Sequence, residues 1–274
     1  MISLWVNSCL HVAVGAGLLS YASATFFNQD QAEVIGLFAF LGTWSVYLAQ
    51  RLFKRKRLGL TQVHEHILDN KRSYGVISLL TGIAAAFVAS ILDTRVLILS
   101  GISFFLALIY IYFPGKQKAL RNSGITKILL VTMVWTLVTA VIPSYEELVE
   151  QPDSALWMFY AERFAFIAMI TIPFDVRDLL RDSKSQKTIP SILGKTGTRI
   201  LIFLLLAICV VLCFFSHQVG YYTAYTFGAL VMVYLFAFIL SFLSRVTHRE
   251  LYFTFFIDGT LILLAAALLS EGLF

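Results

Sequence analysis

Apolar segments close to the length of a membrane span recur along the whole chain. A transmembrane helix needs about 20 mostly apolar residues. Hydrophobic residues make up 59% of the 274 residues and charged residues only 14%, whereas soluble domains carry about 25% charged residues. We therefore expect an all-α integral membrane protein, a single domain over 1–274, with nine transmembrane helices. The predicted spans lie at about 6–24, 34–53, 74–92, 96–113, 125–143, 156–174, 198–216, 221–243 and 252–270.

Basic residues concentrate in alternate connections between the predicted spans. Of the 21 Lys and Arg residues, all but Arg95 and Arg163 lie in or beside the connections after the second, fourth, sixth and eighth spans. Because cytoplasmic loops of membrane proteins are enriched in Lys and Arg, these connections are predicted to be cytoplasmic. The chain is then a multi-pass protein of the cell membrane with its N-terminus inside and its C-terminus outside.

The net charge of +5 follows from this topology and gives little support for nucleic-acid binding. Its densest basic run, Lys54, Arg55, Lys56 and Arg57, is better explained by a loop that faces the anionic membrane surface. We expect membrane lipid as a partner and no nucleic acid. The sequence identifies no protein partner.

Three carboxylates follow one another at helical spacing at the inner end of the sixth predicted span. Asp175, Asp178 and Asp182 lie at positions i, i+3 and i+7, within about 60° of one another around a helix, whereas Arg177 and Arg181 are expected to point the other way. Carboxylates on one face repel each other unless a cation lies among them, and oxygen ligands suit a hard cation such as Mg²⁺. The pattern indicates a magnesium site shared with substrate phosphates, or alternatively a solvated helix end with Asp/Arg pairs.

Charged residues inside the predicted spans are few, and each is a functional candidate because a buried charge in a membrane is costly. They are Glu162 and Arg163 in the sixth span and Asp258 in the ninth. Glu162 and Arg163 are adjacent, diverge by about 100° around a helix and need not pair. The alternative for all three is hydrogen bonding in the bundle interior.

The aspartate segment resembles the second aspartate-rich motif of the UbiA superfamily of intramembrane prenyltransferases. After the D-x-x-D-x-x-x-D pattern comes a short loop with Lys187 and Thr188, and then apolar residues that close on Gly194. The nine predicted spans and the cytoplasmic placement of the motif agree with this family, so the resemblance covers most of the chain.

A second and weaker match lies where the fourth span leads into the fifth. Tyr112, Phe113 and Pro114 are followed by basic residues, which resembles the Tyr-Ser-Pro-Pro connection of the same family. The basic residues of this connection are Lys118, Arg121 and Lys127.

The resemblance implies nine helices around a central lipid-accessible cavity and an activity, the Mg²⁺-assisted transfer of an isoprenoid chain from a polyprenyl diphosphate to a hydrophobic or aromatic acceptor. Ionising the diphosphate builds charge on the leaving group, which metal and basic side chains stabilise. The implied metal ligands are Asp175, Asp178 and Asp182, of which Asp178 and Asp182 are the catalytic candidates. The implied diphosphate ligands are Tyr112, Lys118, Arg121, Lys127 and Lys187.

The first aspartate-rich motif of the family is absent from this chain. The inner end of the second span, Trp44–Arg55, contains no carboxylate. Arg51 is therefore a further catalytic candidate, because its positive charge could replace that of a second Mg²⁺; it could equally be a membrane anchor. Two alternatives to a prenyltransferase stay open, a non-catalytic membrane protein that binds an isoprenoid diphosphate and a membrane terpene cyclase.

Overall fold

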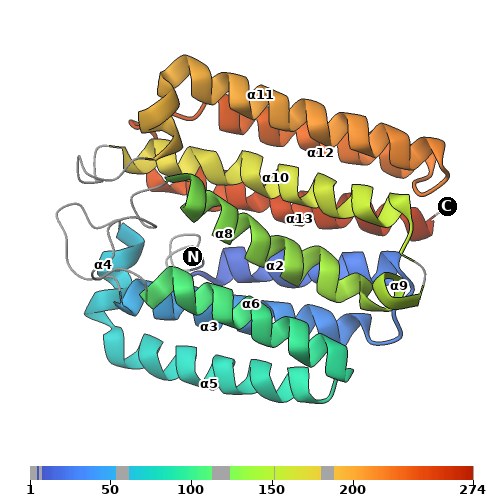
Figure 1. Cartoon of the computed structure of the whole chain (residues 1–274). Helices are drawn as coiled ribbons and strands as arrows, with labels where there is room; N and C mark the ends of the chain where they lie inside the picture. Colours follow the sequence, from blue (N-terminus) through green and yellow to red (C-terminus); the bar gives the residue numbers. More distant parts are fainter. Residues whose placement is uncertain are drawn as a thin grey trace.

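The protein forms a bundle of antiparallel helices (Figure 1). The computed structural model describes residues 5, 8–53, 62–112, 124–150, 152–179 and 188–273, and these residues contain helices and turns but no strand. In chain order the elements are α2 (Leu10–Phe26), α3 (Ala32–Phe53), α4 (Gln62–Asp69), α5 (Lys71–Ser90), α6 (Thr94–Tyr112), α8 (Gly124–Thr136), the π-helical turn η1 (Leu137–Val141), the 3₁₀ turn η2 (Ile142–Ser144), α9 (Tyr145–Glu150), α10 (Ser154–Asp178), α11 (Ile189–Gln218), α12 (Ala224–Phe242), the π-helical turn η3 (Tyr252–Ile257), α13 (Asp258–Leu269) and the 3₁₀ turn η4 (Ser270–Leu273).

The helices confirm a multi-pass membrane protein. Besides the seven full-length helices given at the end of this paragraph, two apolar helices, Leu10–Phe26 and Thr94–Ile109, are shorter than a full span. The predicted count of nine spans and the orientation in the membrane stay predictions. Seven helices in the described part of the chain are long and apolar enough to cross a bilayer: Ala32–Phe53, Lys71–Ser90, Ile125–Glu150, Ser154–Asp178, Ile189–Gln218, Ala224–Phe242 and Tyr252–Leu269.

Polar side chains mark where several helices begin. Asp153 precedes α10, and its carboxylate accepts a hydrogen bond from the Leu156 amide at 2.7 Å, which satisfies a donor that the first helical turn leaves without a partner. Asp93 does the same for the Arg95 amide at 2.7 Å, at the turn that separates α5 from α6. Asp93 therefore caps α6 at the point where the apolar run from 74 to 113 divides into two helices.

Two connections differ from the sequence expectation. Part of the predicted loop 54–73 is the helix α4. Helix α11 begins at Ile189, earlier than the predicted 198, because Pro190 suits a first helical turn. The axis then bends at Gly194, whose φ of 65° is open to glycine but strained for other residues.

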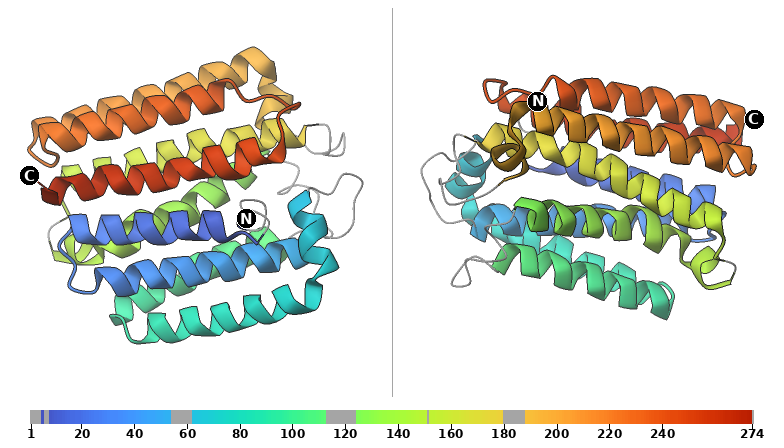
Figure 2. Two further views of the ribbon diagram at one scale, coloured as in Figure 1. Left: turned by 180° about the vertical axis from the view of Figure 1, so that it is seen from behind. Right: turned by 45° about the horizontal axis from the view of Figure 1, so that its top comes forward.

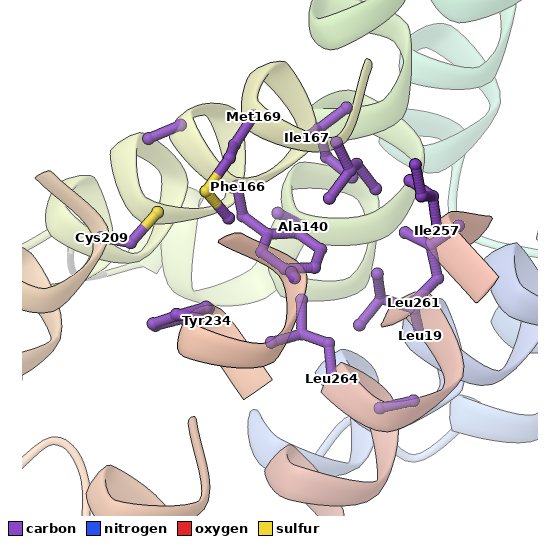
Figure 3. Close-up of a cluster of buried hydrophobic side chains, with 14 of the residues drawn as sticks. Leu19, Ala140, Phe166, Ile167, Met169, Cys209, Tyr234, Ile257, Leu261 and Leu264 are labelled. Atoms are coloured by element: carbon purple, nitrogen blue, oxygen red, sulfur yellow. The ribbon is translucent and has the colours of Figure 1, made fainter. Parts of the chain in front are cut away.

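Helix α10 is the centre of the bundle. It packs against α8, α11, α12 and the π-helical turn η3, and in Figure 2 it lies between the α11–α12 pair and α8. In the most apolar stretch of α10, 72% of the residues are buried, whereas in those of α5, α11 and α12 only 28% are buried and apolar side chains face outward, as expected toward lipid. Figure 3 shows the core side chains that α10 shares with its neighbours, among them Phe166, Ile167, Met169, Tyr234, Leu261 and Leu264.

Helices α2 and α3 approach closely at two glycines. A Cβ atom on Gly17 would lie 2.8 Å from the Phe40 Cβ, and one on Gly36 would lie 2.8 Å from the Tyr21 Cβ. Small residues at such crossings let helix backbones meet inside a membrane. This contact fixes α3, and therefore Arg51 at its last turn, against the rest of the bundle.

Candidate functional site

A cavity of about 200 Å³ lies near the end of the bundle where α3 and α10 end and α8 begins. Its walls come from α2, α3, α6, α8, α10 and the last helix, η3–α13, and they include many apolar side chains such as Val46, Val134 and Ile170. Charged groups gather in the same cavity, from four of these elements: Arg51, Lys127, Asp175, Arg177, Asp178 and Asp258.

Lys127 of α8 and Asp175 of α10 form an ion pair in this cavity. The Lys127 Nζ atom lies 2.5 Å from the Asp175 Oδ1 atom. Only 1% of the Asp175 side chain is exposed, whereas 32% of the Lys127 side chain is exposed. Lys127 therefore compensates a carboxylate that could not otherwise be buried as an anion at low cost.

Arg177 and Asp178 form a second pair one helical turn further along α10. The Arg177 Nε and Nη2 atoms donate to the two Asp178 carboxylate oxygens at 2.8 Å and 3.1 Å. The guanidinium also lies over the Phe174 and Phe253 rings, 5.1 Å and 5.7 Å from their centroids, and its Nη1 atom is 3.9 Å from Glu250. Two-point hydrogen bonding of this kind fixes the orientation of both side chains.

The expectation that Arg177 points away from the aspartates is wrong. Backbone position on a helix sets the direction of the Cα–Cβ bond, but an arginine side chain is long enough to turn back toward its neighbour. Burial against Phe174 and Phe253 and the pairing with Asp178 outweigh exposure to water here. Charged residues in membrane spans usually face the bundle interior, and this rule could have predicted that Arg177 faces the cavity.

Arg51 lines the cavity from α3. It belongs to the last turn of α3, next to Gln50, and both side chains line the cavity together with Tyr47. The structure thus brings four predicted site residues to one cavity: Arg51, Lys127, Asp175 and Asp178. The remaining predictions are not placed, because Tyr112 only ends α6 and the others lie outside the described residues: Lys118, Arg121, Asp182 and Lys187.

The Asp175 and Asp178 carboxylates of α10 could supply some of the ligands of one divalent cation. The Asp175 Oδ2 atom is buried and has no hydrogen-bond partner among the described residues, and carboxylate oxygens are ligands that Mg²⁺ prefers. Within the described ranges no three acidic, His or Cys side chains gather closely enough to hold a metal, and Asp182 lies outside them. The α3 wall, with Gln50 and Arg51, supplies no carboxylate for a second ion.

Glu162 and Arg163 belong to hydrogen-bond networks in the bundle interior, as the alternative for them predicts. Glu162 accepts hydrogen bonds from the Tyr234 hydroxyl and, at 3.4 Å, from the Tyr222 hydroxyl. Arg163 donates to the Thr139 carbonyl at 3.0 Å and to the Ser23 hydroxyl at 3.2 Å. Neither side chain lines the cavity described above.

The sequence profile of the UbiA prenyltransferase family matches residues 70–259, which is more than half of the chain. The chain belongs to this family. Its fold is therefore that of a UbiA membrane prenyltransferase, in agreement with the resemblance of the aspartate segment. No curated protein matches the chain.

Solved structures of other UbiA proteins share the fold over nearly the whole chain. A UbiA homologue from Archaeoglobus fulgidus bound to GPP and Mg²⁺ has a TM-score of 0.69 at 16% identity and covers 97% of this chain and 99% of its own. The apo structure of a UbiA homologue from Aeropyrum pernix K1 has a TM-score of 0.68 at 14% identity, with coverage of 96% and 98%. A digeranylgeranylglyceryl phosphate synthase has a TM-score of 0.58 at 12% identity, with coverage of 99% for both chains. The cavity and its charged residues thus lie inside a UbiA fold.

Proposed function

We propose that this UbiA family protein is a membrane prenyltransferase that moves an isoprenoid chain from a polyprenyl diphosphate to a hydrophobic or aromatic acceptor. The observation that carries the proposal is the gathering of Arg51, Lys127 and Arg177 with Asp175 and Asp178 in one partly apolar cavity. A diphosphate needs cations and hydrogen-bond donors, and an isoprenoid chain needs apolar walls. The UbiA homologue from Archaeoglobus fulgidus has also been solved with DMAPP and Mg²⁺, which supports an isoprenoid diphosphate as the ligand.

The cationic side chains would act on the leaving group. When the bond between C1 of the isoprenoid and the diphosphate oxygen breaks, negative charge grows on the diphosphate, and preorganised cations stabilise it there. Lys127 is partly exposed and can contact phosphate oxygens while it stays near Asp175. Arg51 presents a fork of N–H donors that matches phosphate geometry.

The carboxylates of the aspartate segment would hold one metal ion. Asp175, Asp178 and Asp182 are the proposed ligands, and a bound Mg²⁺ would supply Lewis-acid stabilisation of the leaving diphosphate. Lys127 and Arg177 occupy the carboxylates of Asp175 and Asp178 in this structure. We infer that these two cations stay paired with the carboxylates until metal and diphosphate enter together.

Aromatic side chains would protect the allylic cation. Tyr47 and Trp135 both line the cavity and meet edge to face, with ring centroids 6.4 Å apart. Aromatic faces attract cations electrostatically, most strongly where water is excluded. These rings would therefore hold the carbocation away from water until the acceptor reacts.

Mass spectrometry of the lipids that co-purify with the protein tests the proposal, with an incubation of the purified protein, Mg²⁺ and a prenyl diphosphate beside it. A prenylated acceptor that accumulates during the incubation supports a transferase. A tightly held prenyl diphosphate that is never consumed would instead identify a binding protein. A cyclic hydrocarbon formed without an acceptor would identify a terpene cyclase.

A further inference from the structure

The last transmembrane helix places one more carboxylate in the cavity, on Asp258. Its side chain lines the cavity and is half-buried. Among the described residues no hydrogen bond and no ion pair within 4 Å reaches this carboxylate, and Arg177 instead pairs with Asp178 and lies near Glu250. A carboxylate in the membrane that lacks such partners is costly and marks a functional position.

A widened helical turn sets the position of Asp258. The π-helical turn η3 ends at Ile257, and the Asp258 amide reaches back to the Phe253 carbonyl. Such turns are rare and occur often at functional sites, because they shift the side chains that follow them.

His11 of α2 holds this turn in place. The Trp5 Nε1 atom donates to the His11 Nδ1 atom at 2.9 Å. An indole nitrogen can only donate, so the proton of a neutral His11 ring is on Nε2, and this atom donates to the Phe255 carbonyl at 3.0 Å. The contact ties the start of the chain to the turn that carries Asp258 into the cavity.

Asp258 lies near the cations proposed for the diphosphate but is not paired with them. The charges of Arg177 and Arg51 act on its carboxylate, and all three side chains line one cavity. The reacting carbon C1 is bonded to the diphosphate, so a group near these cations is also near C1. Apolar side chains such as Val12 and Leu261 also line the cavity, and Leu261 lies one helical turn after Asp258 on α13.

We propose that Asp258 binds and deprotonates the acceptor, and that the acceptor carries a hydroxyl group, as an alcohol or a phenol. The carboxylate accepts a hydrogen bond from the acceptor O–H. The C1–O bond to the diphosphate breaks and its electron pair leaves with the diphosphate. The acceptor oxygen then forms a new bond to C1, and its proton passes to Asp258. This inference rests on the proposed transferase function and names the acceptor chemistry of the same site.

The test measures binding of two matched probe pairs to the purified protein in Mg²⁺ and geranyl diphosphate (GPP). In each pair, 4-butylphenol with 4-butylanisole and 1-octanol with heptyl methyl ether, only the first probe has an O–H group. Wild type should bind at least one hydroxyl probe about 10- to 100-fold more tightly than its ether, as expected for a hydrogen bond to a charged group. Asp258→Leu should abolish this preference.

Two further variants distinguish loss of acceptor binding by Asp258 from loss of the folded structure. Asp258→Asn keeps an oxygen that accepts a hydrogen bond but removes the carboxylate that takes the proton. It should therefore retain part of the preference for the hydroxyl probe over its ether and lose transfer of the geranyl group to the hydroxyl probe. Thr260→Val changes a buried hydroxyl on the same helix that bonds only within the helix and should behave like wild type. All three variants should still bind GPP.

The outcomes distinguish this inference from the proposed function. If wild type binds GPP but binds each hydroxyl probe and its ether equally, the assignment of Asp258 is overturned and the transferase proposal stands. Equal preference in wild type and Asp258→Leu would overturn it as well. If wild type binds no GPP in Mg²⁺, the proposed function fails and this inference fails with it.

Discussion

The Lys127 ammonium lies 2.5 Å from the Asp175 carboxylate and joins α8 to α10 at the wall of the cavity. The two partners are unequal, because Asp175 is almost fully buried and Lys127 is about one-third exposed. Removing the cation leaves a buried carboxylate without its charge partner. Removing the carboxylate leaves a lysine that can still turn toward the cavity.

Lys127→Met should therefore destabilise the protein more than Asp175→Asn. We expect a difference of about 1–3 kcal/mol, less than for a fully buried pair because Lys127 is partly exposed. Thermal unfolding in detergent measures it. Added Mg²⁺ should restore part of the stability of Lys127→Met, since the metal returns a positive charge to Asp175. Equal losses in both variants would show that the ion pair does not carry this charge compensation.

Arg51→Gln should lower the rate of prenyl transfer by about 10²–10³, the effect of losing one charge-assisted contact to a developing anion in a dry site. Arg72→Gln is the matched control, because Arg72 is an exposed arginine in the first turn of α5. A steady-state transfer assay compares the two. Small and equal effects would mean that Arg51 is only a membrane anchor.

The crossing of α2 and α3 gives a prediction that does not depend on function. Gly17→Val should destabilise the protein by about 1–3 kcal/mol, because the new side chain would overlap Phe40. Gly101→Val adds the same side chain on α6, where nothing lies within 4 Å of the new Cβ. Thermal unfolding should separate the two variants clearly. A Gly101→Val protein as unstable as Gly17→Val would refute the close packing at Gly17.

Figure 1 shows α4 and α9 at opposite ends of the bundle. With the basic connections inside the cell, a reporter inserted near Lys56 should give a cytoplasmic signal and one near Glu147 an external signal. A reporter fused after Phe274 should also be external. A reversed pattern would show that the predicted orientation is wrong.

Much of the fold could be predicted because each membrane helix corresponds to a long apolar run in the sequence. The break at Asp93 is visible as a short polar interruption. The spacing of Asp175 and Asp178 predicts that both carboxylates share one helix face, and both side chains line one cavity. Asp258 stood out as a charge inside an apolar span. These features depend on local sequence alone.

Other features depend on contacts between distant segments. The direction of Arg177 depends on Phe253, which is far away in the sequence, as well as on the neighbouring Phe174 and Asp178. The π-helical turn before Asp258 is held by His11 of α2. The helix α4 is short and mostly polar, so the sequence has no apolar run that predicts it. A single sequence shows none of these pairings.

We propose that the carboxylates of Asp175, Asp178 and Asp182 bind a prenyl diphosphate through Mg²⁺, and equilibrium binding of radiolabelled GPP to the purified protein tests this most directly. Wild type should bind GPP in Mg²⁺ and lose it in EDTA. Asp178→Ala and Asp182→Ala should weaken binding at least about tenfold, because each removes a hard oxygen ligand, whereas Asp69→Ala, at an exposed residue of α4, should bind like wild type. Binding that survives EDTA, or that is lost in Asp69→Ala and kept in both Asp178→Ala and Asp182→Ala, would contradict this assignment.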